Sequence, residues 1–499
     1  MIVMIGFAKF IFPGLVTLVF SRFFAFVLLL QIFTEFVIIY LMLLFRRLLS
    51  MNNKKVWDVV VLGGGVSGCM AAFAAGKQGA RTLIIERYGF LGGSLTNAGV
   101  GPMMTFHAGE RQVVTGLPQE LVDRLCEKNG CVGHIEDTTS YASSVTPFDA
   151  ETMKLVLDEM AADYGVDVLF HAVISDVKKE NGKILSVTVQ TRRGSLEIEG
   201  RVFVDASGDA ALSFAAGADV HQGRDSDGLC QPMTANMKVS GVDINRLKAE
   251  IKRNPENFNV KDLSSLDRSA KLSMAGFYRE FNQAKKEGRL STEREDVLLF
   301  ETVNPGEIIV NTTRVIRLNP VDPWDLSRAE AEGRKQAAEL IEFFRSSCVG
   351  FEDAILVSTG VQIGVRESRR VMGDYLLTAD DLLTSKLFDD TVALGGYPID
   401  IHNPTGEKTE TTHLKPGQFY YIPLRSLVVK GFSNLLVCGR CISATHEAGA
   451  AIRVTPIAMA TGQAAGVAAG ISALSDTSVR EIEYQRIKDE LIKIGAALN

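Results

Sequence analysis

The chain has 499 residues, of which 46% are hydrophobic and 22% charged, and its formal net charge is −6 at pH 7. This length is sufficient for two or three domains whose cores need no disulfide or metal to hold them. The negative net charge and the lack of a cluster of basic residues along the sequence argue against a nucleic-acid partner. The seven cysteines are odd in number and scattered, which indicates reduced intracellular thiols rather than a disulfide framework.

Residues 1–50 differ from the rest of the chain. They contain ten of the 27 phenylalanines, and the run from Phe23 to Leu43 is almost wholly apolar and long enough to span a bilayer. As an inner-membrane anchor, this run would place the large domain in the cytoplasm, because Arg46 and Arg47 follow it. Any membrane contact is therefore expected through this segment alone.

Other features favour a cytoplasmic protein that starts at Met51. Gln31 and Glu35 lie inside the apolar run, where a carboxylate is costly. Codons with T in the middle position encode only Phe, Leu, Ile, Met and Val, so translated upstream DNA would resemble residues 1–50. A cleaved signal is the least favoured interpretation, because no small-residue cleavage site follows the run. We leave residues 1–50 out of the fold prediction.

The first predicted strand of the large domain covers residues 56–62, which are apolar and rich in β-branched side chains. Gly63, Gly65 and Gly68 follow in G-x-G-x-x-G spacing and lead into an Ala-rich helix. In this order, the first glycine permits a tight turn and the second lets the backbone approach a pyrophosphate. The third allows close packing of helix on strand.

A second apolar strand, residues 82–85, ends at Glu86, which is placed to bind ribose hydroxyls. A bare glycine motif would be weak, since a Gly-rich turn without a ligand has the same spacing. The two strands, the helix and the acid together predict a bound dinucleotide.

Later segments favour FAD over a nicotinamide dinucleotide. The triplet Gly92-Gly93-Ser94 is suited to pass close to a phosphate or a flavin, where a nicotinamide domain would continue directly into a third strand. The chain then returns to the nucleotide fold twice, at residues 196–218 and 434–466.

Four stretches carry a resemblance to a known family: ERYGFLGG (86–93), FVDASGDA (203–210), GVRESRRVMGDYLLTADDL (364–382), and IPLRSLV with the segment NLLVCGRCISATHEAGAAIRVTPIAMATGQAAG (422–466). The chain resembles the FAD-dependent oxidoreductase family, whose fold is shared with fumarate reductase flavoproteins and p-hydroxybenzoate hydroxylase. It is most similar to the branch related to the flavin subunit of heterodisulfide reductases. The resemblance covers residues 56–472 and implies FAD as cofactor and a discontinuous α/β, Rossmann-like FAD/NAD(P)-binding fold of the glutathione-reductase type.

The resemblance also implies cofactor contacts. The pyrophosphate would meet Gly63, Gly65 and Gly68, and the adenosine ribose would meet Glu86. The other implied contacts are Arg87, Gly93 and Ser94 along the cofactor, the backbone of Val173 at the adenine edge, and Ala206, Ser207 and Gly208 near the ribityl–pyrophosphate region. Ser207 stands where threonine is commoner, so the hydroxyl is kept.

The C-terminal motif is predicted to hold the flavin ring. A strand ends at Gly439 and Arg440, where the resemblance requires a glycine for close approach to the cofactor. A helix is expected over residues 453–470, and its N-terminus would offer amides and positive dipole to the pyrimidine edge of the flavin. The candidate contacts at this end are Ile452, Arg453 and Val454. For Arg453, a packing or surface salt bridge is the alternative.

The predicted domain organisation follows from where the nucleotide motifs fade. The FAD-binding domain comprises residues 56–222 and 422–475, and residues 223–421 form an inserted α+β substrate or cap domain. Residues 476–499 are expected to form a C-terminal helix. Within the FAD domain, residues 184–204 alternate around a central Arg-Gly pair as a β-hairpin does.

Candidates for catalysis are His107, His446, Arg366 and Arg453. The two histidines follow flavin-associated segments, and for each a structural hydrogen bond is the alternative role. Arg366 either binds a substrate carboxylate through a bidentate contact or orients the cap domain.

The leading functional prediction is an FAD-dependent oxidoreductase that transfers a hydride between flavin N5 and a small organic substrate. No second complete G-x-G-x-x-G is present, which argues against a separate NADPH domain. The alternatives are an electron-transfer subunit with a redox partner protein, and a non-catalytic flavin-binding protein. Cys438 and Cys441 have C-x-x-C spacing, but without a second ligand pair they predict no metal site and are interpreted as small buried residues near the flavin.

Overall fold

The computed structural model describes residues 56–406 and 409–499. Residues Trp57–Asn499 form one compact unit. The predicted anchor or alternative start in residues 1–50 lies outside the described residues.

A parallel sheet forms the core of this unit. Residues 57–62, 82–85 and 435–437 form short strands of this sheet that are almost entirely buried, as expected when helices or other elements cover both faces of a parallel sheet. The strand order is β5-β2-β1-β8-β20, with every neighbouring pair parallel. The strands are β1 (Trp57–Leu62), β2 (Thr82–Ile85), β5 (Asp167–Leu169), β8 (Gly194–Asp205) and β20 (Leu435–Val437).

Strand β8 belongs to two layers. Its second half pairs with β1 and β20, and its first half pairs with β7 (Lys183–Thr191), which in turn pairs with β6 (Val173–Glu180). The turn of the β7–β8 hairpin lies between Thr191 and Gly194. This confirms the hairpin predicted from the alternation of residues 184–204.

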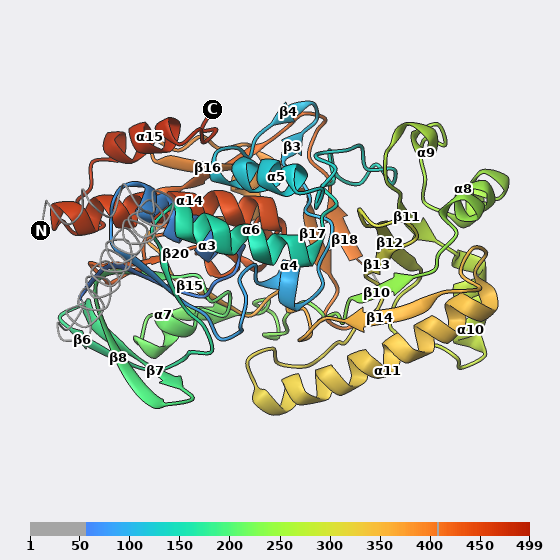
Figure 1. Cartoon of the computed structure of the whole chain (residues 1–499), viewed down its shortest axis with the longest axis horizontal. Coiled ribbons are helices and arrows are strands. Elements are labelled where there is room, and N and C mark those ends of the chain that lie inside the picture. The colour runs from blue at the N-terminus through green and yellow to red at the C-terminus, as the bar shows by residue number, and fades with distance from the viewer. Residues whose placement is uncertain (1–55, 407–408) are drawn as a thin grey trace, which may run out of the picture. The chain divides into compact units, whose positions relative to one another are not determined.

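Two apolar helices, α3 (Val66–Lys77) and α14 (Thr455–Ser475), pack on the parallel sheet and on each other (Figure 1). Their contact is close because it is built on small residues. A Cβ added at Gly466 would lie 2.0 Å from the carbonyl oxygen of Ala71. By length and hydropathy α14 alone among the helices of residues 56–406 and 409–499 could span a membrane, but 94% of its apolar window is buried inside the protein, as in a core helix.

Helix α14 starts later than predicted. The helix expected over residues 453–470 is present as α14, which begins two residues later, and a short helix that was not predicted, α13 (His446–Ile452), precedes it. Val454 between them is extended (φ −65°, ψ 147°), and Pro456 occupies the first turn of α14. Proline lacks the N–H that a continuous helix would use, so the second helix begins there.

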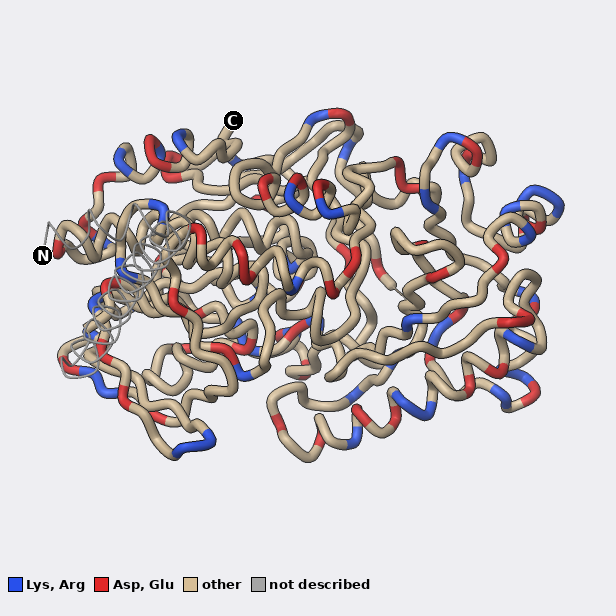
Figure 2. Tube along the Cα trace, viewed as in Figure 1, with Lys and Arg blue, Asp and Glu red and all other residues tan. Residues whose placement is uncertain are grey.

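A five-stranded antiparallel sheet forms a second layer, which has its own hydrophobic core. Its order is β11-β12-β13-β10-β14, and helix α11 (Pro323–Ser347) runs alongside it (Figure 1). Lys, Arg, Asp and Glu alternate along the exposed length of α11, whereas α3 and α14 are nearly free of charge (Figure 2). The strands are β10 (Met237–Ser240), β11 (Ser273–Gly276), β12 (Val297–Glu301), β13 (Ile308–Val310) and β14 (Ile355–Thr359).

Short elements connect these layers. The strand pairs are β3 (His107–Ala108) with β4 (Arg111–Gln112), β9 (Val220–Gln222) with β15 (Arg369–Val371), β16 (Thr391–Gly395) with β19 (Tyr420–Pro423), and β17 (Ile399–His402) with β18 (Thr409–Thr412). The other helices of the described part are α4 (Ser94–Asn97), α5 (Leu117–Glu127), α6 (Ala150–Asp163), α7 (Ala211–Ala215), α8 (Ile244–Arg253), α9 (Ser265–Arg268), α10 (Tyr278–Lys286), α12 (Ala379–Leu383) and α15 (Tyr484–Lys493). The predicted α/β fold with an additional α+β layer is confirmed, and the exact domain limits stay a prediction.

Candidate active site

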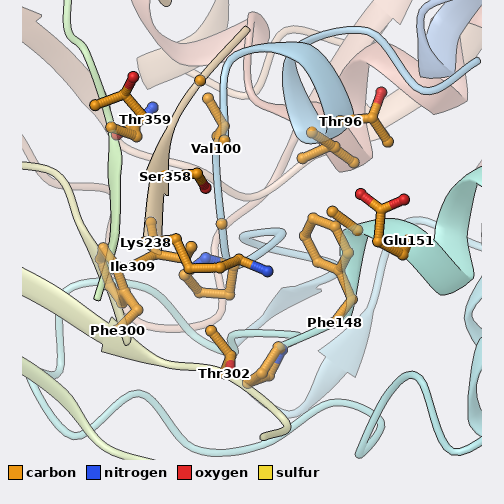
Figure 3. Close-up of a pocket in the computed structure, with 18 of the residues that line it drawn as sticks. Thr96, Val100, Phe148, Glu151, Lys238, Phe300, Thr302, Ile309, Ser358 and Thr359 are labelled. Atoms are coloured by element: carbon orange, nitrogen blue, oxygen red, sulfur yellow. The ribbon is translucent and has the colours of Figure 1, made fainter. Parts of the chain in front are cut away.

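A cavity of about 710 Å³ lies at the carboxyl ends of β1 and β8 and extends to the antiparallel sheet. Ligands of open α/β sheets bind at this edge of the strands. The cavity is lined by the turn after β1, the N-termini of α3 and α14, and residues of β12 such as Leu298 and Phe300. One wall, which includes Val100, Asn236 and Phe300, is shared with a smaller cavity of about 260 Å³. Figure 3 shows the smaller cavity, where the Lys238 side chain reaches toward the ring of Phe148.

The turn after β1 approaches α3 and β8 too closely for side chains. Gly63 has φ +102°, and a Cβ there would lie 2.5 Å from the carbonyl oxygen of Ala206. A Cβ at Gly68 would lie 1.9 Å from the carbonyl oxygen of Gly63. Gly68 therefore serves helix–strand packing, and it is not among the residues that line the cavity.

Gly65 differs from its neighbours because space is open beside it. It is the N-cap of α3, no side chain caps the helix, and no acid lies in the first turn. A Cβ at Gly65 would meet only the Cα of Gly93, at 3.7 Å. The uncapped amides and the helix dipole thus face a groove bounded by two glycines, which is an arrangement suited to a phosphate.

Glu86, at the end of β2, lines the same groove. Its Oε2 accepts a hydrogen bond of 2.6 Å from the backbone N–H of Gly64, and its Oε1 accepts one of 2.9 Å from that of Tyr88. These bonds fix the carboxylate at the edge of the cavity. Its contact with a ribose stays a prediction.

The second glycine loop lies directly against the first. The N–H of Gly92 donates to the carbonyl of Gly64 at 2.8 Å, and α4 follows from Ser94. Asn97, in the last position of α4, lines the cavity, and its Oδ1 is buried without a hydrogen-bond partner in the described part of the chain. An orphaned buried acceptor at this position calls for a donor from a bound molecule.

The remaining predicted cofactor residues divide into two groups. Those that line the cavity are Arg87, Gly93, Ser94, Val173, Ala206, Ser207, Gly208, Arg440, Arg453 and Val454. Arg440 is also engaged within the protein, since it pairs with Asp209 at 2.7 Å and donates to the carbonyl of Gly208 at 2.9 Å.

Two of the predicted contacts lie off the cavity. Ile452 is only 1% exposed and is not among the lining residues. Gly439 approaches α3 rather than the cavity, because a Cβ there would lie 2.5 Å from Oγ of Ser67. The glycine was expected for close approach to a cofactor, but the structure uses it for close approach to a helix.

The far end of the cavity is polar and is built by Asn311, which follows β13, by β17 and β18, and by the segment around Arg366. Arg366 donates to the carbonyl of Pro232 at 2.9 Å, to Oδ1 of Asn311 at 3.1 Å and to the hydroxyl of Thr234. Burial, together with Arg453, Arg314 and Arg294 nearby, lowers the pKa of Arg366 well below its ordinary value. Several cations therefore gather around one end of the cavity.

Asp400 is the acid at this end. Its Oδ2 lies 3.2 Å from Nε2 of His402, 3.4 Å from the hydroxyl of Tyr397 and 3.5 Å from Nη2 of Arg453. Burial works against the charged carboxylate, but His402 and Arg453 outweigh it and hold the pKa of Asp400 below its ordinary value. The carboxylate is therefore shared among several partners.

His402 is held as a neutral ring. Nη2 of Arg314 lies 3.0 Å from its Nδ1, and since an arginine can only donate, that nitrogen is the acceptor. The proton is then on Nε2 and points to Asp400. Burial lowers the pKa of His402 to about 3, in agreement with this tautomer. Both ring nitrogens are in use, so His402 positions Asp400.

Tyr141 and Tyr397 face each other beside Asp400, with ring centroids 5.9 Å apart. Both line the cavity, and burial raises the pKa of each phenol well above its ordinary value. The hydroxyl of Tyr141 also lies 3.3 Å from Oγ1 of Thr411. Both phenols are protonated at neutral pH and are available as donors.

A family model described as FAD dependent oxidoreductase matches residues 58–491. The chain belongs to the FAD-dependent oxidoreductase family.

Two curated relatives of this flavoprotein are archaeal. The flavoprotein is 28% identical over 190 residues to "Digeranylgeranylglycerophospholipid reductase 2" of Methanothermobacter thermautotrophicus. These residues make up 38% of this chain and 48% of that protein. The flavoprotein is also 28% identical over 173 residues to "Thiamine thiazole synthase" of Methanococcus aeolicus. These residues make up 33% of this chain and 59% of that protein. The chain thus spans about half the length of these relatives.

Among solved structures, the flavoprotein is similar to the flavin-dependent brominase Bmp2, with a TM-score of 0.48, 13% identity, and coverage of 87% of this chain and 83% of that chain. It is also similar to a geranylgeranyl bacteriochlorophyll reductase-like protein of Thermoplasma acidophilum, with a TM-score of 0.42, 14% identity, and coverage of 89% and 84%.

FAD is the cofactor of this family, and the cavity of the flavoprotein fits it. The groove at Gly65 and the uncapped start of α3 suit the pyrophosphate. The orphaned Oδ1 of Asn97 requires a donor. Helix α14 also begins at the cavity without a side-chain cap, at Val454. These groups are the ones that would hold the two phosphates and the polar edge of the flavin.

The two histidines predicted for catalysis lie away from this cavity. His446 is buried, and its Nδ1 lies 2.8 Å from Oε1 of Glu367, which also pairs with Arg370. His107 lies in β3, with Nδ1 2.9 Å from Oγ of Ser144. Neither histidine lines the cavity, so the structure brings Arg366 and Arg453 together there but not these two residues.

The cavity contains residues that the motifs did not single out: Asn97, Tyr141, Tyr397 and Asp400. Asn97 follows the second glycine loop closely, so its proximity to that motif was a usable signal. Tyr141 lies in a stretch without a recognisable motif. Asp400 belongs to the segment 391–402, and its place beside Arg366 depends on tertiary structure.

Cys438 and Cys441 are both fully buried. Burial raises the pKa of the Cys438 thiol to about 12 and that of Cys441 well above its ordinary value. Both are therefore protonated thiols at neutral pH. Within residues 56–406 and 409–499, no group of three His, Cys, Asp or Glu side chains is arranged to hold a metal ion.

Proposed function

We propose that this FAD-dependent oxidoreductase transfers a hydride between the flavin and a small organic substrate that binds in the same cavity. One observation carries the proposal. The cavity is continuous from the phosphate groove at Gly65 to the buried polar end at Arg366 and Asp400. A site that only held a cofactor would not need this second end.

When bound, FAD supplies two-electron chemistry by accepting or donating a hydride. The chain supplies the surroundings. The start of α14 offers amides and positive dipole to one side of the cavity. Arg366 and Arg453 bind and orient the substrate, and the antiparallel sheet with Phe300 covers the site and excludes water.

A proton moves with the hydride in the oxidation of a C–OH or C–N bond, or in the reduction of a C=C bond. In a reduction, the hydroxyl of Tyr141, which is protonated at neutral pH, donates this proton. In an oxidation, the same hydroxyl passes the proton of the substrate on to the Asp400 carboxylate, to which it is hydrogen-bonded. Tyr397 and His402 hold the Asp400 carboxylate in position. Both directions of hydride transfer remain within this proposal.

The test is anaerobic absorption spectroscopy of the purified flavoprotein. Small alcohols, amines, saturated acids and activated alkenes are mixed with the oxidised protein, and the alkenes also with the dithionite-reduced protein. The proposal predicts that at least one class bleaches or restores the visible flavin band without another protein. A flavin that responds only to an added protein fraction would instead support the predicted electron-transfer subunit related to heterodisulfide reductases.

The proposed location is the cytoplasm, with the inner-membrane anchor as the alternative. The support is confined to the sequence, since the apolar segment lies outside the described residues. Mass spectrometry of the mature N-terminus separates the two. A first residue at Met51 or Asn52 contradicts the anchor.

A further inference from the structure

Arg366 is held in place entirely by neutral groups. Its partners are a backbone carbonyl, a hydroxyl and a side-chain amide, from Pro232, Thr234 and Asn311. These bonds use three of the five N–H donors of the guanidinium. Two donors remain, and the side chain lines the cavity. A rigid guanidinium with unused donors is preorganised for a ligand.

Arg366 forms no ion pair with any residue in 56–406 or 409–499. Asp400, the acid of this end of the cavity, is divided between His402 and Arg453. At 3.5 Å, its contact with Arg453 is at the outer limit of a hydrogen bond. The Nε of Arg453 is buried and has no hydrogen-bond partner in the described part of the chain.

The other acids on the cavity wall are not available to these two arginines. Each has its own partner or lies in solvent: Asp209 pairs with Arg440, Asp296 with Arg294, Glu330 with Arg334, Glu86 with two backbone amides, Asp137 with groups of its own turn, and Glu295 is exposed. A buried guanidinium without an acid is costly unless a ligand supplies the negative charge.

We propose that Arg366 and Arg453 form an anion site that takes a carboxylate of the substrate. This inference rests on the proposed function and names the substrate class of the same cavity. A carboxylate offers two oxygens to the unused donors of Arg366 and to Nε of Arg453. Since Arg453 directly precedes Val454, the N-cap of α14, the anchored substrate lies beside the helix start that we assign to the flavin.

Equilibrium binding to the FAD-loaded protein tests the site without turnover. The probes are formate, lactate, succinate and benzoate, each beside its neutral amide, and the readout is the perturbation of the oxidised flavin spectrum. We expect saturable binding of at least one carboxylate and no saturation by its amide. Arg366→Gln is expected to weaken this binding by tenfold or more, because a charge-assisted, bidentate contact is lost.

Two further variants keep the test decisive. Arg246 is exposed and pairs with Glu352 away from the cavity, so Arg246→Gln removes the same charge and should leave binding unchanged. If Arg366→Gln fails to fold or loses flavin, Arg453→Gln is titrated instead and should show the same loss.

The inference is overturned if amides bind as tightly as carboxylates, if formate and the larger acids all fail to bind, or if both arginine variants bind like the parent protein. Failure of the proposed function looks different. Carboxylates would then bind at this site, yet no small molecule would change the redox state of the flavin.

Discussion

At the scale of single residues, Gly65 separates cofactor binding from folding. Its backbone conformation (φ −65°, ψ 169°) is open to any amino acid, and a methyl group there would contact only Gly93 at an ordinary distance. The neighbouring Gly63, by contrast, cannot accept a Cβ without a clash with Ala206. The two glycines of this motif are therefore required for different purposes: Gly63 for the packing of the fold and Gly65 for space in the cofactor groove.

We predict that Gly65→Ala folds normally but binds FAD at least tenfold more weakly, because the methyl group enters the phosphate groove. Gly63→Ala should lower both the thermal midpoint and the FAD content. Flavin released by denaturation and thermal unfolding of the apoprotein measure the two effects. A Gly65→Ala protein with full FAD affinity would place the pyrophosphate elsewhere.

Tyr141 tests the proton assignment. Tyr141→Phe should keep FAD but lower the rate of flavin reduction about a hundredfold or more, the usual range for a lost general acid or base. The matched control is Tyr484→Phe, which removes a tyrosyl hydroxyl that donates to the Thr391 carbonyl away from the cavity. Equal rates in the parent protein and Tyr141→Phe would contradict the assignment.

His134 makes stability depend on pH. Its nitrogens lie 2.7 Å from Oγ1 of Thr146 and 2.9 Å from Oε1 of Gln119, and burial lowers its pKa to about 4. The unfolded chain, with a histidine pKa of about 6.5, binds the proton first on acidification. Stability is therefore full above pH 6.5 and falls from there toward pH 4, with a slope of at most about 1.4 kcal/mol per pH unit from this group.

We predict that His134→Gln reduces this slope when urea unfolding of the holoprotein is compared between pH 7.5 and pH 5. His221→Gln is the matched control, because His221 is exposed on β9. An unchanged slope in His134→Gln would show that His134 is not held neutral in the folded protein.

At the scale of elements, the contact of α3 with α14 holds the two ends of the cofactor groove together. Gly466→Ala would drive a methyl group against the backbone of Ala71, 2.0 Å from its carbonyl oxygen. We predict a loss of about 1–3 kcal/mol in the free energy of unfolding, the range for overpacking a tight core. The thermal midpoint of the apoprotein measures it.

Gly449→Ala, in α13, provides the control for a helical glycine with room. Its nearest neighbour would be Cδ of Arg370 at 3.4 Å, which is an ordinary contact. Alanine has the better helix propensity, so this variant should be neutral or slightly more stable. Similar losses in both variants would contradict the packing explanation.

Local sequence patterns predicted the cofactor half of the molecule well. The strand at 56–62, the glycine turn and the hairpin around Gly194 follow from apolar runs, spacing and alternation within a few residues of one another. The predicted start of α14, at residue 453, was two residues too early. The extended residue Val454, which separates α13 from α14, had been included in the predicted helix.

The substrate half could not be predicted in the same way. Asp400, Tyr141 and Arg366 lie far apart in the chain and meet only through the folding of three separate segments. His446 followed a flavin-associated motif, but its side chain turns to Glu367. Proximity to the motif thus placed His446 in a segment near the cofactor, but it could not show that the side chain turns away from the cavity.

At the scale of the whole molecule, the parallel sheet supplies the cofactor groove, and the antiparallel sheet together with the β17–β18 pair bounds the rest of the cavity. The cavity joins the two, and its charge is uneven along its length. Uncapped helix starts border the groove, and Arg366 with Arg453 border the far end. We propose that this arrangement serves one small molecule that carries a carboxylate rather than a protein redox partner.

The most direct measurement is therefore the anaerobic half-reaction of the purified protein with its active carboxylate, compared between the parent protein and Arg366→Gln at equal FAD content. We predict that flavin reduction or reoxidation saturates with the carboxylate in the parent protein, and that Arg366→Gln needs at least tenfold more of it to reach half the maximal rate. The account would be contradicted if both proteins responded at the same concentration, or if the flavin changed redox state only when a second protein was added.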